Sequence, residues 1–124
     1  MENKDKTVID LLEIFNNIDD MITVHDGDFN IILANKAAQE KLGLPSLDNV
    51  KAKCFRYFHG KDHPPDGCPS CKCIITGVTA KFEMFEPHLN MPISIKAIPR
   101  FNDNGQFIGM IHIVKELPGE NSVA

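Results

Sequence analysis

Four side chains with sulfur or nitrogen donor atoms lie close together near the middle of this 124-residue chain. They follow the pattern Cys54-x4-His59-x8-Cys68-x2-Cys71. Three thiolates and one imidazole form a ligand set that tetrahedral Zn²⁺ prefers. A structural metal ion would contribute folding energy directly to a proline-rich segment with little regular structure of its own. The pattern therefore favours a zinc site at these four residues.

Other chemistry is open to the same cysteines. With Cys73 in place of the histidine, the four thiols could hold an iron-sulfur cluster, which would make the domain an oxygen or redox sensor. Cys54 and Cys68 could also form a disulfide or a redox thiol pair, or the thiols could have no special role. Cys73 itself lies in an apolar run, where a cysteine is expected to be a small core residue.

A catalytic role is the weaker interpretation of these residues. Cys54 or Cys68 could act as a nucleophile with His59 or His63 as its base. However, the sequence contains no recognisable third orienting group, oxyanion motif or glycine-rich phosphate loop. We therefore expect a non-enzymatic domain.

The remaining histidines have ordinary interpretations. His25 is expected to be a solvated turn residue, and His88 lies in a predicted connection between strands. His112 alternates with two isoleucines on the last predicted strand. It could face either solvent or the pocket, and solvent is favoured because a single polar residue on a strand usually faces water.

The first half of the chain contains the clearest secondary-structure signals. Apolar residues recur at spacings of three and four over 7–18, which predicts an amphipathic helix with Thr7 as its cap. Runs at 21–24 and 29–34, separated by a segment with Asp-Gly, predict a hairpin. Asn35 and Gly43 are the start and stop signals of a short helix over 36–42.

The second half predicts irregular structure followed by strands. Prolines and glycines between 45 and 70 favour short helical turns and loops, and a further helical turn is expected over 70–75. Strands are predicted at 78–85, 93–101 and 107–114. The order indicates an α+β domain with a five-stranded antiparallel sheet, helices on one face and a pocket between them. The expected pocket lining is Ile22, Ile32, Phe82 and Ile95.

This order resembles the PAS domain family, and three segments carry the resemblance. Residues 22–38 (ITVHDGDFNIILANKAA) are similar to the first hairpin and following helix of the family. Residues 98–117 (IPRFNDNGQFIGMIHIVKEL) are similar to the last hairpin of PAS domains attached to sensor histidine kinases. The middle segment resembles a subset with Cys, an aromatic residue before His-Gly, and Cys-Pro followed by a further Cys or His. These elements are here Cys54, Phe58, His59-Gly60, Cys68-Pro69 and Cys71. The family's Asp-containing exit motif is replaced here, so that Glu116 would take the role of the aspartate.

The resemblance implies a sensory or regulatory module of a sensor histidine kinase or related two-component protein. An alternative is an interaction and dimerisation module without a ligand, and another is a redox sensor. The loose similarity of 53–58 to the flavin-binding motif does not support a flavin adduct, and no histidine lies on the segment where haem-binding members carry their axial ligand. Domain bounds are expected at 7–117, with flexible ends at 1–6 and 118–124.

Composition limits the partners. Hydrophobic residues make up 43% and charged residues 24% of the chain, as in ordinary globular domains. The net charge of −4 disfavours nucleic-acid binding, and the apolar runs are too short for a membrane span. We expect a soluble, cytoplasmic domain whose pocket could either hold a small molecule or be filled by side chains. Its broad apolar stripe over 7–18 is expected to form a homodimer.

Overall fold

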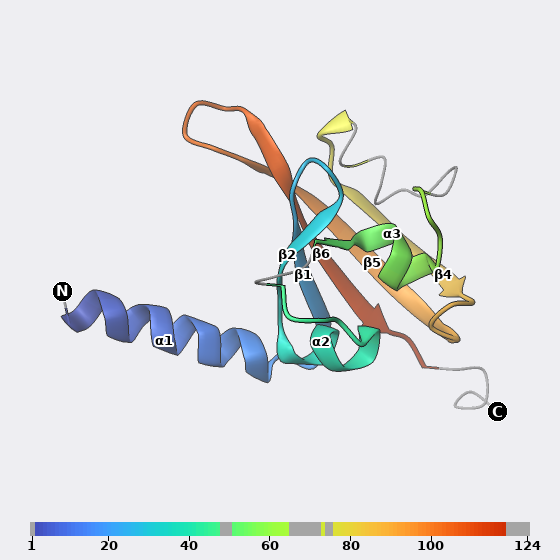
Figure 1. Cartoon of the computed structure of the whole chain (residues 1–124), viewed down its shortest axis with the longest axis horizontal. Helices are drawn as coiled ribbons and strands as arrows, with labels where there is room; N and C mark the ends of the chain where they lie inside the picture. The colour runs from blue at the N-terminus through green and yellow to red at the C-terminus, as the bar shows by residue number, and fades with distance from the viewer. Residues whose placement is uncertain (1, 48–50, 65–72, 74–75, 119–124) are drawn as a thin grey trace.

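The computed structural model describes residues 2–47, 51–64, 73 and 76–118. Within them the chain forms an antiparallel sheet with strand order β3-β2-β1-β6-β5-β4 and three helices (Figure 1). The strands are β1 (Met21–His25), β2 (Asn30–Ala34), β3 (Ala52–Lys53), β4 (Ala80–Glu86), β5 (Met91–Phe101) and β6 (Phe107–Glu116). The helices are α1 (Glu2–Asn17), α2 (Lys36–Leu42) and α3 (Cys54–His59).

The predicted α+β class is confirmed, but the described sheet has six strands where five were predicted. The additional strand, β3, contains two residues and pairs with β2 through Ala52 opposite Ile31. A two-residue strand is too short to show an alternating pattern, so no sequence signal could indicate it.

The β1–β2 hairpin is organised by Asp26. Its Oδ1 accepts hydrogen bonds from the backbone N–H groups of Asp28 and Asn30, each at 2.9 Å, and its Oδ2 accepts one from Asn30 Nδ2 at 3.0 Å. The side chain thus replaces water at the backbone groups of the turn, as aspartates in turns commonly do. The predicted hairpin is confirmed, with its first strand extended by one residue to His25.

The helix α2 has the predicted start and stop. Asn35 accepts a hydrogen bond from Ala38 N through its side chain, and Gly43 ends the helix in the left-handed conformation at φ 63°. The helix α1 differs, because it begins at Glu2 and contains Thr7 in its interior. The preceding Glu and Lys residues are good helix formers and extend the helix beyond the apolar stripe.

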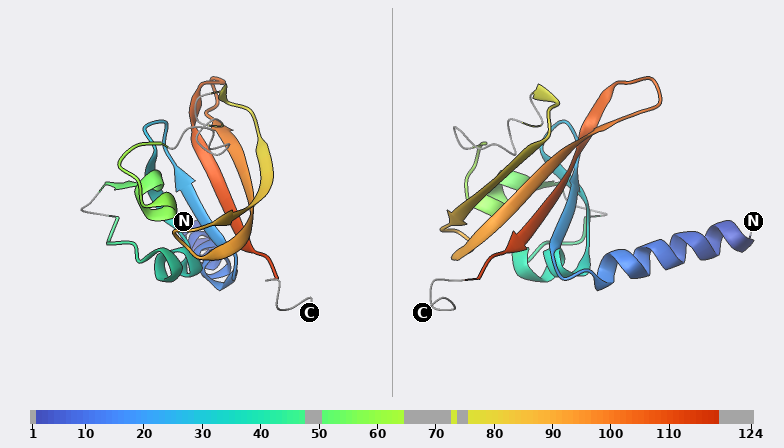
Figure 2. Two further views of the ribbon diagram at one scale, coloured as in Figure 1. Left: turned by 90° about the vertical axis from the view of Figure 1, so that its right-hand side faces the viewer. Right: turned by 180° about the vertical axis from the view of Figure 1, so that it is seen from behind.

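One face of the sheet carries the core. Strand β1 alternates so that Met21, Thr23 and His25 are buried, and β5 does the same with Ile93, Ile95 and Ala97. Together with α2 and α3, this inner face forms the larger hydrophobic cluster. Both helices lie on the same side of the sheet, and the view from behind shows no described helix across the opposite, outer face (Figure 2).

No helix among the described residues is long and apolar enough to cross a membrane.

Candidate functional site

The helix α3 lies over the inner face and positions the candidate site. Its first residue, Cys54, donates a backbone hydrogen bond to Phe29 O at 2.9 Å, which anchors the helix to the β1–β2 hairpin. Cys54, Phe55 and Phe58 face the core and are buried. Gly60 ends the helix at φ 65°, a conformation that glycine adopts without steric cost. The helix therefore places Phe58 against the middle of the sheet and His59 at its edge.

Two buried histidines lie beneath Phe58. His25 ends β1 and His112 lies on β6, and their ring centroids are 5.1 Å apart. The Phe58 ring meets His112 edge-to-face at 4.6 Å. Thr23 pairs with His112 across the strands, and its Oγ1 lies 2.7 Å from His25 Nε2. These four residues form the histidine centre, in which three polar side chains lie beside Phe58 inside an otherwise apolar core.

Burial holds both imidazoles in their neutral form. Loss of hydration lowers the pKa of His25 to about 3, although neighbouring Asp26 acts in the opposite direction. Loss of hydration also lowers the pKa of His112 well below its ordinary value, and His25 and His59 add to this effect. A neutral imidazole has one donor and one acceptor nitrogen, so the histidine centre can both give and receive hydrogen bonds.

The histidine centre contains a buried ring nitrogen without a hydrogen-bond partner. His25 Nδ1 is buried without one, and so is Asn30 Oδ1 in the adjacent strand. A buried polar atom without a partner costs about 1–3 kcal/mol of stability. The position of His25 therefore lowers the stability of the fold unless another molecule supplies the partner.

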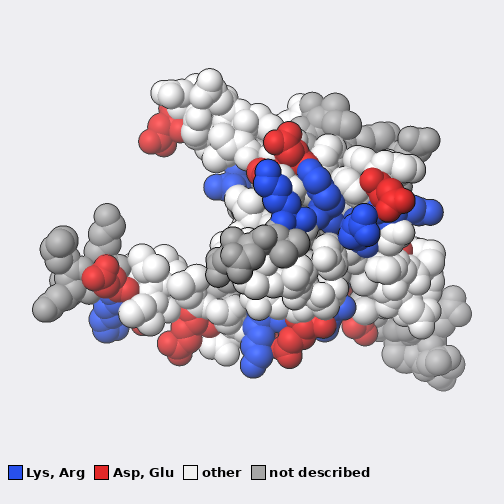
Figure 3. All heavy atoms as spheres, viewed as in Figure 1, with Lys and Arg blue, Asp and Glu red and all other residues white. Residues whose placement is uncertain are grey.

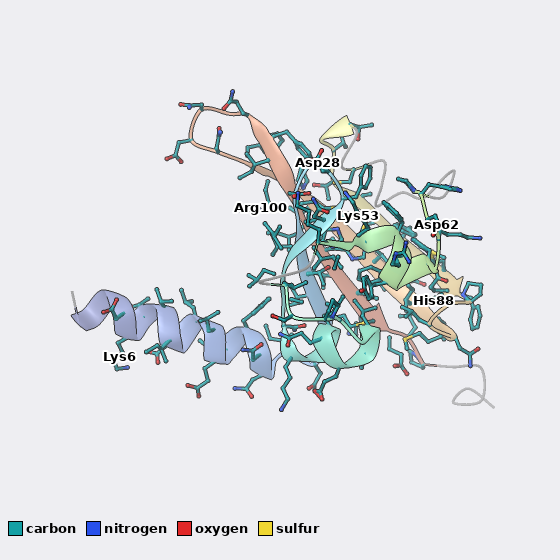
Figure 4. The ribbon with its side chains drawn as sticks, viewed as in Figure 1. Lys6, Asp28, Lys53, Asp62, His88 and Arg100 are labelled. Carbon is teal, nitrogen blue, oxygen red and sulfur yellow. The ribbon has the colours of Figure 1, made fainter. Side chains whose placement is uncertain are left out.

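A second polar group lies at the edge of the sheet. Glu86, at the end of β4, is only 3% exposed. Its Oε1 contacts His59 Nδ1, and its Oε2 accepts a hydrogen bond from the backbone N–H of His88 at 2.8 Å. His59, Gly60, Lys61, Glu86, Pro87 and His88 line an open cleft of about 420 Å³. Figure 4 shows His88 at this end of the sheet, on the turn that joins β4 to β5.

Basic side chains gather near the same helix. In the space-filling view, lysines and arginines cluster on the face that carries α3 (Figure 3). Lys53, Arg56 and Lys61 belong to this part of the chain, and Arg56 forms an exposed ion pair with Asp62 at 3.4 Å. Exposed ion pairs of this kind contribute little to stability.

The structure locates two of the four predicted metal ligands. Cys54 and His59 are the first and last residues of α3, and Cys68 and Cys71 lie outside the described residues. Cys54 is a free thiol within the larger hydrophobic cluster, whereas His59 contacts Glu86 at the edge. Among the described residues, no three His, Cys, Asp or Glu side chains are grouped so that they could hold a metal ion.

Cys73 is a core residue, as predicted. It is 1% exposed, and its thiol lies 3.7 Å from the carbonyl oxygen of Ala97. The predicted helical turn around it falls mostly outside the described residues.

The predicted pocket lining is divided between the two faces of the sheet. Phe82 and Ile95 are cross-strand partners that pack together on the inner face. Ile22 pairs with Ile113 on the outer face, and Ile32 is 49% exposed on β2. The structure therefore brings two of the four residues together and separates them from the other two.

The histidine centre was missed because His25 was expected in a solvated turn and the solvent-facing alternative was favoured for His112. Both are buried, so the prediction for His25 is wrong, and His112 takes the other alternative, an orientation toward the inner face. The alternation of Met21 and Thr23, continued by one residue, places His25 on the inner face, and this was the available signal. Glu86 had no such signal, because its partner His59 is distant in sequence.

Comparisons with known proteins agree on one family. The family model described as "PAS domain" matches residues 11–74. Comparison with curated proteins found no match. Similar solved structures include the PAS domain of a protein from Colwellia psychrerythraea, with 18% identity over 90% of this chain and 97% of that chain and a TM-score of 0.62. The PAS domain of an HTR-like protein from Haloarcula marismortui has 17% identity over 94% of this chain and 96% of that chain, with a TM-score of 0.65. A sensory box sensor histidine kinase from Vibrio cholerae has 11% identity over 94% of each chain, with a TM-score of 0.58.

Proposed function

The chain belongs to the PAS domain family, and on this premise we propose that it is a sensory module that regulates a signalling protein. A sensor histidine kinase of a two-component system is the kind of parent protein that the similarity to PAS domains from such kinases favours. Its role is to bind a signal molecule between α3 and the sheet and to transmit the resulting conformational change to an attached output domain.

The histidine centre is the observation that carries this proposal. A core that only stabilises the fold is served best by apolar side chains, because burying a polar group without a partner is unfavourable. His25 Nδ1 has no partner, and Thr23 and Phe58 hold the ring in place. A small polar molecule that hydrogen-bonds to a neutral imidazole would satisfy this nitrogen. The ligand class is therefore small, uncharged and capable of hydrogen bonding.

Mass spectrometry of the purified protein tests the proposal. We expect a small molecule to remain bound under native conditions and to be released on denaturation. His25→Leu should lose the molecule while remaining folded, and the control His63→Leu should keep it because His63 is exposed. A ligand-free wild type that no polar compound from a metabolite library stabilises would refute the sensory proposal. The alternative, an interaction and dimerisation module, would then be favoured.

A metal site in the same domain is a second proposal, and the contact between His59 and Glu86 favours it. Metal-binding histidines commonly donate their other ring N–H to a carboxylate, which fixes the tautomer and orients the ring. Glu86 is buried and held by His88 N, so it is suited to this positioning role for His59. The proposed ligands are Cys54, His59, Cys68 and Cys71, with zinc as the metal.

Elemental analysis of protein purified without chelators tests the metal proposal. We expect close to one equivalent of zinc, lost in Cys68→Ser and retained in Cys73→Ser. Cys54→Ser tests the ligand that lies in the core. Visible absorption in a sample prepared without oxygen would indicate the alternative iron-sulfur cluster instead. A metal-free protein whose mass is lower by two hydrogens would indicate a disulfide and would exclude the metal.

A homodimer through α1 is also part of the proposal. Val8, Leu11 and Ile14 are half or more exposed on this helix. Exposed apolar surface of this kind commonly marks an interface.

A further inference from the structure

The histidine centre is closed in this structure. His25 is fully buried, and the Phe58 ring covers both imidazoles, with its centroid 6.2 Å from the His25 ring and 4.6 Å from the His112 ring. The two strands that carry the histidines are paired along the whole of β1. Separating these strands would break several backbone hydrogen bonds at once. A molecule that binds His25 therefore requires an element over the inner face to move.

The first end of α3 is held by backbone hydrogen bonds. Its first residue, Cys54, donates through its N–H to Phe29 O at 2.9 Å. The two preceding residues, Ala52 and Lys53, form β3 and pair with β2. These bonds join backbone to backbone and depend on no side chain. This end of α3 is therefore fixed to the sheet.

The last end of α3 is held by side chains. Glu86 contacts His59 Nδ1 through Oε1 and accepts a hydrogen bond from His88 N at 2.8 Å through Oε2. The His88 ring lies against Gly60, where an added Cβ atom would come within 2.8 Å of Nδ1. Between described residues, no backbone hydrogen bond joins this end of α3 to β4 or β5. We call His59, Glu86 and His88 the latch.

The open cleft of about 420 Å³ lies at the latch, on the side where His88 reaches the end of α3 (Figure 4). Its volume is in the range of small-molecule sites. Phe58 directly precedes His59, so a movement of the last turn of α3 carries the Phe58 ring away from the imidazoles. The cleft then continues into the histidine centre.

Of the two described helices over the inner face, α3 is better suited to move. The helix α2 is capped by Asn35, whose buried side chain also donates to Ile18 O and Asp20 O. The helix α3 has six residues, which is too short for a helix that is stable by itself. Lids over binding sites come from the parts of a fold with low local stability.

We infer that α3 is a lid over the histidine centre, hinged at Cys54 and released at the latch, and that the cleft is the entrance for the ligand. This inference rests on the proposed ligand at His25. It adds the route that the ligand takes and the residue, Glu86, that controls the route.

NMR exchange relaxation of the whole chain tests the lid. Glu86→Ala removes the buried carboxylate of the latch, so the open fraction measured at Phe58 and Gly60 should rise about tenfold or more. The Cys54 amide, at the hinge, should stay as in the wild type. Glu86→Gln keeps an acceptor for His88 N and should show a smaller rise. An unchanged open fraction in Glu86→Ala, or an equal rise at Cys54, would show that α3 does not open at the latch.

Arg56→Ala is the matched control. Arg56 also lies on α3, but it forms an exposed ion pair with Asp62 and takes no part in the latch. Its substitution should leave the open fraction unchanged. The rise in Glu86→Ala should also persist in a Cys68→Ser background, which removes one proposed metal ligand. A rise that disappears in this background would assign the effect of Glu86 to the metal site and overturn the latch.

The entrance has its own measurement, the rate at which the retained small molecule leaves the protein under native conditions. Release from Glu86→Ala should be about tenfold faster than from the wild type, and release from Arg56→Ala should not differ. Equal release rates in Glu86→Ala and the wild type would overturn the entrance and leave the sensory proposal intact. A wild type that neither retains nor is stabilised by a small molecule would overturn both.

Discussion

At the scale of single residues, the buried imidazoles make the fold sensitive to acid. His25 and His112 are neutral in the folded protein because burial lowers both pKa values. In the unfolded chain each imidazole regains an ordinary pKa near 6.5 and takes up a proton as the pH falls below it. The unfolded state then binds more protons, so stability present above pH 6.5 is lost progressively toward pH 3.

We predict that between pH 7.5 and pH 5 the free energy of unfolding falls by about 2 kcal/mol from His25 alone. His112 adds to the loss in the same direction. Urea unfolding at the two pH values measures the effect. His112→Leu should show a smaller pH dependence than the wild type, and His63→Leu should not differ from it. Equal pH dependence in all three proteins would show that the buried histidines are not responsible.

A glycine on β6 gives a second prediction at this scale. Gly109 has φ 143°, and a Cβ atom there would overlap the backbone carbonyl oxygen of His25 on the paired strand. Gly109→Ala should therefore push β1 and β6 apart and cost roughly 3 kcal/mol or more. Gly105 also has a positive φ, 78°, but no atom lies near its missing Cβ. Gly105→Ala should cost only about 1 kcal/mol. Similar losses in both variants by thermal unfolding would argue against the steric cause.

The sequence predicted single residues well where the signal was local. Asn35 as a cap, Gly43 as a stop and Cys73 as a core residue depend on near neighbours, and all three are confirmed. His25 and His112 depend on which strands pair, and this information is absent from a local pattern. The ligand set at Cys54, His59, Cys68 and Cys71 stays a prediction, because two of its members lie outside the described residues.

At the scale of elements, strand and helix types were more predictable than their ends. Periodicity identified α1, turn residues identified the β1–β2 and β5–β6 hairpins, and start and stop residues identified α2. The strand β3 was missed because only its pairing with β2 defines it. The contact between α3 and β4 through His59 and Glu86 joins elements 27 residues apart, a distance that no short motif spans.

Asn35 provides a prediction at the element scale, since one side chain holds α1, β1 and α2 together. Asn35→Asp keeps the oxygen that accepts from Ala38 N but loses the two donations to Ile18 O and Asp20 O. A carboxylate facing two carbonyl groups is repelled, so the variant should lose about 2–3 kcal/mol of stability.

Asn102 is the matched control for Asn35. Its Oδ1 also accepts two backbone hydrogen bonds, from Asn104 N and Gln106 N, but in the exposed β5–β6 turn. Asn102→Asp keeps both bonds in water and should cost less than 1 kcal/mol. Chemical denaturation that finds the two substitutions equally harmful would contradict the role assigned to Asn35.

At the scale of the whole molecule, the apolar surface of α1 determines whether the domain is a monomer. Leu11 and Phe15 lie on the stripe, four residues apart and on the same side of the helix. Charged side chains there should prevent burial of the stripe against a second copy while leaving the sheet unchanged, because α1 makes its main contact only at its C-terminal end. We predict that Leu11→Glu combined with Phe15→Glu yields a folded monomer.

Ile9→Glu is the matched control, because Ile9 is 63% exposed but lies outside the stripe, so this variant should remain dimeric. Sedimentation or light scattering at high micromolar concentration measures the mass, and circular dichroism checks the fold. If the double variant stays dimeric, or if Ile9→Glu dissociates equally, the association does not depend on this face of α1.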